Sequence, residues 1–347
     1  MTTDSCAPTH QTHPCQPLRV GVLGAARITP TALLTPARLL PEVEIAAVAA
    51  RDPERARRFA KRHGIARVLP DYRSIIDDPE IDAIYNPLPN SHHCEWTIRA
   101  LEAGKHVLCE KPLASNAEEA RRMTEAAERS ERLLMEAFHW RHHPLAARMR
   151  EIVTDGTLGR IRHIEASLCV PILAPGDIRY RYDLSGGALM DLGGYTVNMV
   201  RHLAGDEPEV VSADVRLSGP DVDRWAQAEL AFADGRSGRI TCSLLSSTLL
   251  RIAVRVVGED GRLDVFNPLA PHIHHRLTVR SGGRKRHERV RGESSYACQL
   301  RAFVASLRSG VPPSTDGRDG IANMVVIDAI YRAAGLPLRG MSRRLDD

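Results

Sequence analysis

Lys105-His-Val-Leu-Cys-Glu110-Lys111-Pro112 is the stretch that decides the fold, because a short apolar strand ends here on a charged pair and a proline. Lysine is rare in this chain: only four of its 47 basic residues are Lys, and Lys111 is one of them. An amine can transfer a proton, which a guanidinium does not do at neutral pH. Lys111 is therefore either a catalytic amine or an ordinary surface lysine at the end of a strand.

Short apolar strands alternate with amphipathic helices from residue 18 to about 137, the pattern of a parallel sheet covered on both faces. We predict a doubly wound Rossmann domain over residues 18–141 of this α/β chain. Strands are expected at 18–23, 43–50, 68–69, 83–85, 105–109 and 133–137. Helices are expected at 28–40, 52–63, 72–77, 91–103 and 116–130, with Pro36 kinking or dividing the first.

Residues 142–347 have a different texture. Strand-like runs joined by turns follow one another from 161 to 290, and several alternate in polarity, which is typical of an antiparallel sheet with one covered face. Helices are expected at 145–154, 186–203, 295–307 and 320–334. We predict a substrate-binding and oligomerisation α/β domain with a large open, mainly antiparallel sheet, whose last helix can pack back on the first domain. Burial of the open face predicts a homodimer or homotetramer.

Composition places the chain among ordinary globular proteins. It has 347 residues, 43% of them hydrophobic and 26% charged, and its net charge is only +4. This balance does not indicate nucleic-acid binding, and no apolar stretch is long enough to span a membrane. The seven scattered Cys fit a reducing compartment, so we expect a cytoplasmic protein.

Residues 1–17 are rich in Thr, Pro and Gln, and we expect a disordered leader rather than a secretory signal. This segment holds Cys6, His10, His13 and Cys15, a set that is able to bind zinc on paper. Their spacing matches no common zinc finger, so we predict no metal site.

The first domain opens with a strand, a glycine-bearing turn and the start of a helix, Arg19-Val-Gly-Val-Leu-Gly-Ala-Ala-Arg-Ile28. Dinucleotide-binding folds place pyrophosphate at such a turn, against free backbone N–H groups. Aligned to G-x-G-x-x-G, the segment keeps only Gly24, with Ala26 and Thr29 at the other two positions. The motif by itself is weak, and its place directly after the first strand is what indicates a cofactor turn.

The end of the second predicted strand indicates which cofactor is bound. NAD-selective sites carry Asp or Glu here, to hold the ribose 2′-hydroxyl. This chain has Arg51, whose guanidinium suits the 2′-phosphate of NADP, and Asp52 is explained as the cap of the next helix. Such a contact is worth about 1.5–3 kcal/mol, which predicts a roughly 10- to 150-fold preference for NADP over NAD. The alternative is that Arg51 is an ordinary solvated arginine.

Two further segments carry candidate site residues. Asn86-Pro-Leu-Pro-Asn-Ser-His-His93 follows the fourth strand, where ligands bind in parallel sheets, so His93 either lines the cofactor or sits in the first turn of a helix. In Gly186-Gly-Ala-Leu-Met-Asp-Leu-Gly-Gly-Tyr195, Asp191 and Tyr195 are four residues apart and share a helix face. The four glycines of this segment indicate close approach, either to a ligand or to a tightly packed helix.

Together these segments resemble the glucose–fructose oxidoreductase / inositol dehydrogenase (Gfo/Idh/MocA) family. The matching pieces are 21–28, 89–93, 103–112, Trp140-Arg141 and 187–195. The resemblance runs from about residue 18 to 340 and implies an N-terminal Rossmann domain, a C-terminal α/β domain and NAD(P)-dependent oxidoreductase activity. Tyr195, where many members have His, looks like the branch with dihydrodiol dehydrogenases, NADP-dependent D-xylose dehydrogenases and nucleotide-linked ketosugar reductases.

The resemblance assigns roles residue by residue. It implies that Lys111 is the catalytic lysine and Asp191 the active-site Asp, and acid–base logic makes Tyr195 the proton donor or acceptor. On the cofactor side we predict Gly24, Ala25, Ala26, Arg27, Ile28, Arg51, Leu88, Asn90, His93, Glu110, Lys111 and Arg141. His139, where an apolar residue is commoner in the family, departs from the pattern and leaves the local pocket shape open.

The expected chemistry is hydride transfer between a nicotinamide and a carbinol or carbonyl carbon, with a proton moving on the oxygen. Lys111 is expected to lower the pKa of Tyr195 and to stabilise developing alkoxide, with Asp191 orienting the pair. The Lys111-Pro112 bond is a candidate for the cis form. We predict an NADP-dependent dehydrogenase of a sugar or cyclic diol. One alternative is an NADPH-dependent reductase of a keto-sugar, including a nucleotide-linked one. The other is a non-catalytic cofactor-binding regulator, against which the three retained catalytic residues argue.

Overall fold

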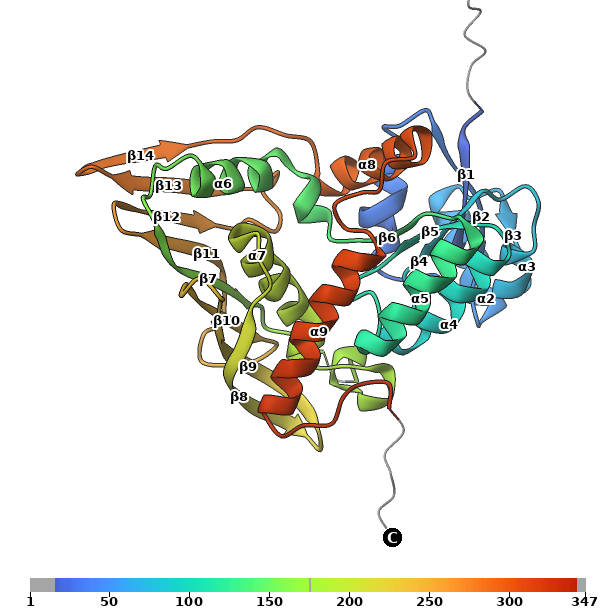
Figure 1. Cartoon of the computed structure of the whole chain (residues 1–347). Coiled ribbons are helices and arrows are strands. Elements are labelled where there is room, and N and C mark those ends of the chain that lie inside the picture. The colour runs from blue at the N-terminus through green and yellow to red at the C-terminus, as the bar shows by residue number, and fades with distance from the viewer. Residues whose placement is uncertain (1–15, 175, 342–347) are drawn as a thin grey trace, which may run out of the picture.

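The computed structural model describes residues 16–174 and 176–341 (Figure 1). The four Cys and His residues near the N-terminus, and nearly all of the predicted leader, lie outside these ranges. Two sheets with their own helices form the body of the molecule, and α9 (Gly317–Ala333) runs between them.

The first sheet is parallel and has the strand order β3-β2-β1-β4-β5-β6, as predicted for a Rossmann domain. Its strands are β1 (Leu18–Leu23), β2 (Val43–Ala49), β3 (Arg67–Val68), β4 (Ala83–Asn86), β5 (His106–Cys109) and β6 (Leu134–Glu136). Its helices are α1 (Thr35–Ala37), α2 (Pro53–His63), α3 (Tyr72–Ile76), α4 (His93–Glu102) and α5 (Ala117–Ser130). A Cβ at Gly21 would lie 2.6 Å from Ile75, so glycine is what lets α3 approach β1.

The helix predicted over residues 28–40 is shorter than expected. It begins as a π-helical turn, η1 (Pro30–Leu34), and continues as α1. The change of helix type falls directly before Pro36, which has no N–H to donate to the preceding turn. The chain leaves the helix at Arg38, so the proline divides this segment and then ends it early.

The second sheet has the strand order β14-β13-β12-β11-β7-β10-β9-β8. Every neighbouring pair is antiparallel except β7 with β10, so the sheet is mainly antiparallel, as predicted. Its strands are β7 (Ile161–Cys169), β8 (Glu209–Gly219), β9 (Val222–Ala231), β10 (Ser237–Ser243), β11 (Arg251–Gly258), β12 (Gly261–Phe266), β13 (Arg276–Ser281) and β14 (Arg284–Glu288). Helices α6 (Pro144–Thr154) and α7 (Gly194–Ala204) lie on one face of it (Figure 1).

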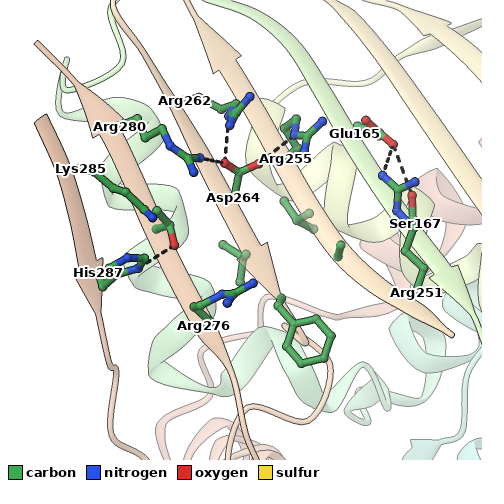
Figure 2. A pocket seen from close by; sticks show the side chains of 15 residues that line it. Glu165, Ser167, Arg251, Arg255, Arg262, Asp264, Arg276, Arg280, Lys285 and His287 are labelled. Atoms are coloured by element: carbon green, nitrogen blue, oxygen red, sulfur yellow. Dashed lines mark hydrogen bonds and ion pairs between the residues drawn. The ribbon is translucent and has the colours of Figure 1, made fainter. Parts of the chain in front are cut away.

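The opposite face of this sheet is charged and holds a shallow hollow of about 420 Å³ (Figure 2). At its centre, Asp264 accepts hydrogen bonds from Arg255 (2.8 Å), Arg262 (2.8 Å) and Arg280 (2.6 Å). The other charged side chains that line the hollow are Glu165, Arg251, Arg276 and Lys285. Exposed ion pairs stabilise a fold little, so this face is a solvated surface or an interface rather than part of a core.

The last two helices join the two halves of the molecule. Although α8 (Ser295–Ser309) falls within the predicted second domain, it places Leu300, Phe303 and Val304 in the core of the first. α9 packs against α5 of the first domain and against α7 and β8 of the second. The C-terminal part of the chain therefore fixes how the two sheets face each other.

A buried ion pair secures the end of the chain. Arg339 and Asp223 are both fully buried, and the guanidinium donates to the Asp223 carboxylate (2.9 Å) and to the Gly186 carbonyl (2.9 Å). The same carboxylate accepts from the Tyr331 hydroxyl (2.9 Å) and from the Leu189 amide (2.6 Å). Leu189 is the first residue of the helical stretch that carries Asp191, the predicted active-site carboxylate. Because the Leu189 amide binds Asp223, the Arg339–Asp223 ion pair fixes where this stretch begins.

Candidate active site

The turn after β1 has the geometry of an anion-binding site. Gly24 adopts φ +89°, a left-handed conformation that costs glycine little, and its amide donates to Ala49 O at 2.6 Å. A Cβ at this position would also lie 3.1 Å from Leu88. Within the described residues, the amides of residues 25–28 donate to no other group, so they are free to bind phosphate oxygens.

Charged residues follow β2, beside this turn. Asp52 caps α2, as predicted, by accepting from the amides of Glu54 (2.9 Å) and Arg55 (3.3 Å). Arg51 is exposed, and in the described part of the chain its guanidinium has no partner. Arg55 was not predicted to lie in the site, yet it donates to Ala25 O at 2.8 Å and brings a second guanidinium to the turn. The only sequence feature that indicated Arg55 was its position, as a second arginine four residues after Arg51.

His93 lies beneath the loop between β4 and α4. Its side chain is fully buried, with Nδ1 2.9 Å from Pro112 O and Nε2 2.8 Å from Leu88 O. Burial lowers its pKa to about 4, so the imidazole is neutral and donates from one nitrogen only. His93 therefore contacts two loops of the site and hydrogen-bonds one of these two carbonyls, without reaching the surface of the site. Asn90 of the same loop reaches the second domain, where Nδ2 donates to Ser185 O at 3.0 Å.

Lys111 and Asp191 meet at the junction of the two domains. The Lys111 amine donates to Asp191 Oδ1 and to the Asp191 backbone carbonyl, each at 2.8 Å. Burial by itself would raise the pKa of Asp191, but the adjacent Lys111 and Arg179 outweigh it and hold that pKa below its usual value. Asp191 is therefore ionised beside the amine. The Lys111–Pro112 peptide bond is cis, which confirms the prediction.

Tyr195 lies next to this pair with its hydroxyl free. Lys111 Nζ lies 4.8 Å from the centroid of the Tyr195 ring, and no described group hydrogen-bonds the hydroxyl. Burial, followed by the neighbouring Tyr296 and Glu110, raises the pKa of Tyr195 well above its usual value. The prediction of a lowered pKa for Tyr195 is wrong, because burial disfavours the phenolate by more than the Lys111 amine over the ring favours it. Tyr195 is thus a neutral phenol that can donate a proton.

The stretch that carries these two side chains is not one regular helix. The helix predicted over residues 186–203 begins instead as a π-helical turn, η6 (Leu189–Gly193), and continues as α7. Gly187 precedes it with φ +141°, and a Cβ there would fall 2.2 Å from Asp223 Oδ1. This glycine therefore serves close packing within the domain, one of the two alternatives that the sequence left open. Single π-helical turns are often found at functional sites.

Glu110 and Arg141, both predicted on the cofactor side, have different surroundings. Glu110 accepts from the Tyr85 hydroxyl at 2.7 Å, and burial raises its pKa although Tyr85 and Lys111 oppose the shift. Arg141 lies 3.7 Å from Asp319, in the first turn of α9. The structure thus places Glu110 beside Lys111 and Arg141 among the contacts between the domains.

Arg179 is a residue of the site that was not predicted. It lies in a 3-10 turn, η4 (Ile178–Tyr180), after β7, and its Nε donates to Asp191 Oδ2 at 2.6 Å. Asp177 accepts from Arg179 Nη1 (3.1 Å) and from Arg27 Nη2 (3.1 Å), so the predicted cofactor turn touches the second domain. The only signal in the sequence was a charged Asp-Ile-Arg between two predicted elements, a composition shared by many surface loops.

The described residues hold no group of three or more His, Cys, Asp or Glu side chains placed to bind a metal ion. No helix in the same ranges is long and apolar enough to cross a bilayer.

Comparison with known proteins gives the same picture. A model of an oxidoreductase family with an NAD-binding Rossmann fold (GFO_IDH_MocA) matches residues 18–138, and the GFO/IDH/MocA C-terminal domain matches residues 146–264. The dTDP-3,4-didehydro-2,6-dideoxy-alpha-D-glucose 3-reductase of Saccharopolyspora spinosa is 40% identical over 92% of this chain and 98% of its own. D-xylose 1-dehydrogenase (NADP(+)) 2 of Haloferax volcanii is 34% identical over 90% of this chain and 96% of its own. A crystal structure of a 3-ketoreductase from Actinomadura kijaniata with NADP and TDP-benzene has a TM-score of 0.85 and 31% identity, covering 92% of this chain and 98% of that chain.

Proposed function

We propose, since the chain belongs to the GFO/IDH/MocA oxidoreductase family, that it transfers hydride between NADP(H) and a carbinol or carbonyl carbon of a sugar or cyclic diol. The observation that carries this proposal is the convergence of Lys111, Asp191 and Tyr195 at the domain junction. An amine from the first domain and a carboxylate and a phenol from the second form one acid–base group there.

A second candidate function is the NADPH-dependent reduction of a nucleotide-linked keto-sugar. The relative with 40% identity is a 3-reductase of a dTDP-linked deoxy sugar. The neutral phenol of Tyr195 also favours proton donation to a carbonyl oxygen. Both functions use the same side chains and differ in substrate and in direction.

The residues on the cofactor side fit NADP. The free amides of residues 25–28 would hold the pyrophosphate, and Arg51 with Arg55 would hold the 2′-phosphate. The carboxylate next to them in sequence, Asp52, is engaged in capping α2. NADP(H), when bound, supplies or accepts the hydride.

Tyr195 is the proton donor in the direction of reduction. Its raised pKa keeps the hydroxyl protonated, and because no described group binds that hydroxyl, it is available to the substrate oxygen. Lys111 places positive charge beside an oxygen that becomes negative. Asp191 holds the amine in place through Oδ1. In the direction of oxidation the same groups act in reverse order.

We also propose that the chain works in the cytoplasm as a homodimer or homotetramer that buries the charged face of the second sheet. Around the hollow on this face, six side chains are basic and two are acidic. Two such faces repel each other at long range, and salt screens that repulsion. Association through this face should therefore strengthen as salt is added.

Turnover tests the proposal directly. Free sugars and diols are screened with NADP, and keto-sugars, including nucleotide-linked ones, with NADPH. In the active combination, Lys111→Met and Tyr195→Phe should each lower kcat about 10²-fold or more and change the Kd of NADPH less than about threefold. Near-normal kcat in both variants would reject the assigned mechanism.

A further inference from the structure

Ion pairs run without a break from the turn after β1 to the catalytic lysine. Arg27 Nη2 lies 3.1 Å from Asp177 Oδ2, and Arg179 Nη1 lies 3.1 Å from Asp177 Oδ1. Arg179 Nε donates to Asp191 Oδ2 at 2.6 Å, and Asp191 Oδ1 accepts from Lys111 at 2.8 Å. The first domain supplies both ends of this series of charges, and the second domain supplies its middle.

Burial decides which of these contacts is strong. The Arg27 side chain is 80% exposed, so water screens its pair with Asp177. The side chains of Asp177 and Asp191 are only 3% and 16% exposed, and that of Arg179 is 35% exposed. Charge-assisted hydrogen bonds that are shielded from water are stronger and more directional than exposed ones. The contacts of Arg179 are therefore the ones that can impose a geometry on the site.

We propose that Arg179 is a positioning residue for the hydride-transfer reaction proposed above, on which this inference rests. Its Nε holds Oδ2 of Asp191 while Oδ1 faces the amine of Lys111, so a cation at each oxygen fixes the plane of the carboxylate. A carboxylate held through one oxygen can rotate about its Cβ–Cγ bond, and the amine then keeps only its contact with the Asp191 backbone carbonyl as a fixed one. Misplacing a catalytic group by about 1 Å is enough to lower a rate roughly 10²-fold.

Asp177 in turn fixes Arg179. Its Oδ1 accepts from the backbone amide of Arg179 (3.0 Å) and from Nη1 of the same residue (3.1 Å). It is the N-cap of the η4 turn, so one carboxylate sets both the backbone and the guanidinium of Arg179. Loss of the Asp177 carboxylate should therefore act in the same direction as loss of Arg179, and more weakly.

Removal of Arg179 also changes the titration of Asp191. The charged and titratable groups around this carboxylate are Lys111, Arg179, Glu110, Tyr195 and Cys242. Burial raises the pKa of Asp191 and the two cations lower it, so the pKa rises when one cation is removed. The acid limb of the kcat profile should then move to higher pH, a change that a loss of fold stability alone does not produce.

The variants to compare are Arg179→Gln, Arg179→Lys and Asp177→Asn, with Arg181→Gln as a matched control. Arg181 lies in the same loop, and its exposed guanidinium pairs with the exposed Asp183. We expect Arg179→Gln to lower kcat about 30- to 100-fold while the Kd of NADPH changes less than about threefold. Arg179→Lys keeps the charge and should recover part of kcat, and Arg181→Gln should behave as wild type.

A second measurement needs no substrate. The chain has four lysines, so reaction with an amine reagent can be followed at each of them by mass spectrometry. In Arg179→Gln the carboxylate is free to rotate and holds the amine of Lys111 less firmly, while the hydrogen bond of that amine to the Asp191 backbone carbonyl remains. Lys111 should therefore be labelled faster relative to the exposed Lys285, by roughly threefold or more, and at the wild-type rate in Arg181→Gln.

Equal kcat, pH profile and labelling in wild type and Arg179→Gln would overturn the inference. The inference would also fail if kcat fell together with NADPH affinity by a similar factor and the melting temperature dropped as well, because that result describes a structural role. If Arg179→Gln does not fold, Arg179→Lys and Asp177→Asn decide by the same readouts. If wild type and Arg181→Gln turn over no sugar, diol or keto-sugar, the proposed function fails, whereas faster labelling of Lys111 still supports the positioning role.

Discussion

Replacing Arg51 with Ala should weaken the binding of NADP and spare that of NAD. Arg51 follows β2 beside the turn whose free amides would hold the pyrophosphate, and its guanidinium has no partner among the described residues. The substitution therefore removes a charge without breaking a contact inside the protein. Any change in affinity then reports on the ligand rather than on the fold.

The structure also sets the size of this effect. A hydrogen bond to a charged group contributes about 1.5–3 kcal/mol. Since Arg51 is exposed, screening reduces its share to about 1–1.4 kcal/mol, which is roughly five- to tenfold in Kd. Arg55 stays on the turn through its hydrogen bond to Ala25 O (2.8 Å), so Arg51→Ala keeps part of the preference for NADP. The larger preference for NADP over NAD that the sequence predicts therefore requires both arginines. A double Arg51→Ala, Arg55→Ala variant should lose this preference.

Isothermal titration of wild type, Arg51→Ala and Arg62→Ala with NADP and with NAD measures this preference. Arg62 is a matched control, because it is exposed in the last turn of α2 and its removal changes the net charge equally. Two results would refute the reasoning: wild-type protein that binds NAD as tightly as NADP, or an Arg51→Ala variant that binds both more weakly by the same factor. The second result would mean that Arg51 supports the adenine pocket or the fold.

Three further outcomes are expected. Arg339→Leu leaves the Asp223 carboxylate buried without its ion pair, so urea denaturation should show a loss of about 3–5 kcal/mol in unfolding free energy; a loss below about 1 kcal/mol would contradict this. Burial raises the pKa of Glu136 to about 8, so the folded protein binds this proton more tightly than the unfolded chain and loses stability as pH rises toward that value. Glu136→Gln should therefore raise the melting temperature more at pH 8 than at pH 5, and an equal change at both would count against the shift. Light scattering at micromolar protein should show a dimer or tetramer that becomes more populated with added salt, whereas a monomer at every salt concentration would reject association through the charged sheet face.

The strands of both sheets could be predicted because their signal is local. Buried parallel strands read as short apolar runs, and β1 to β6 lie where that pattern places them. Helix caps are equally local, since Asp52 and Asn116 each bind amides within three residues. Lys111 and Asp191 were recognised from separate short motifs, and the fold brings them together across 80 residues of sequence.

Contacts across the domain junction could not be predicted in this way. Arg179 is one arginine among many, and only the packing of its loop against Asp191 distinguishes it. The apolar face of α8 does not reveal from its pattern which of the two cores it joins. The pKa of Tyr195 depends on the water left around its ring and on the side from which Lys111 approaches, and no local pattern encodes either.

The charges around Tyr195 favour one direction of the chemistry. The Lys111 amine lies 4.8 Å from the centroid of the Tyr195 ring and places positive charge beside the phenol, although Asp191 balances part of that charge. Positive charge stabilises an oxygen that becomes negative, and a neutral phenol can then protonate it. Reduction of a carbonyl therefore starts from the protonation state that the protein already has. Oxidation of an alcohol requires Tyr195 to give up its proton first, so kcat for oxidation should rise toward alkaline pH while kcat for reduction stays level through the neutral range.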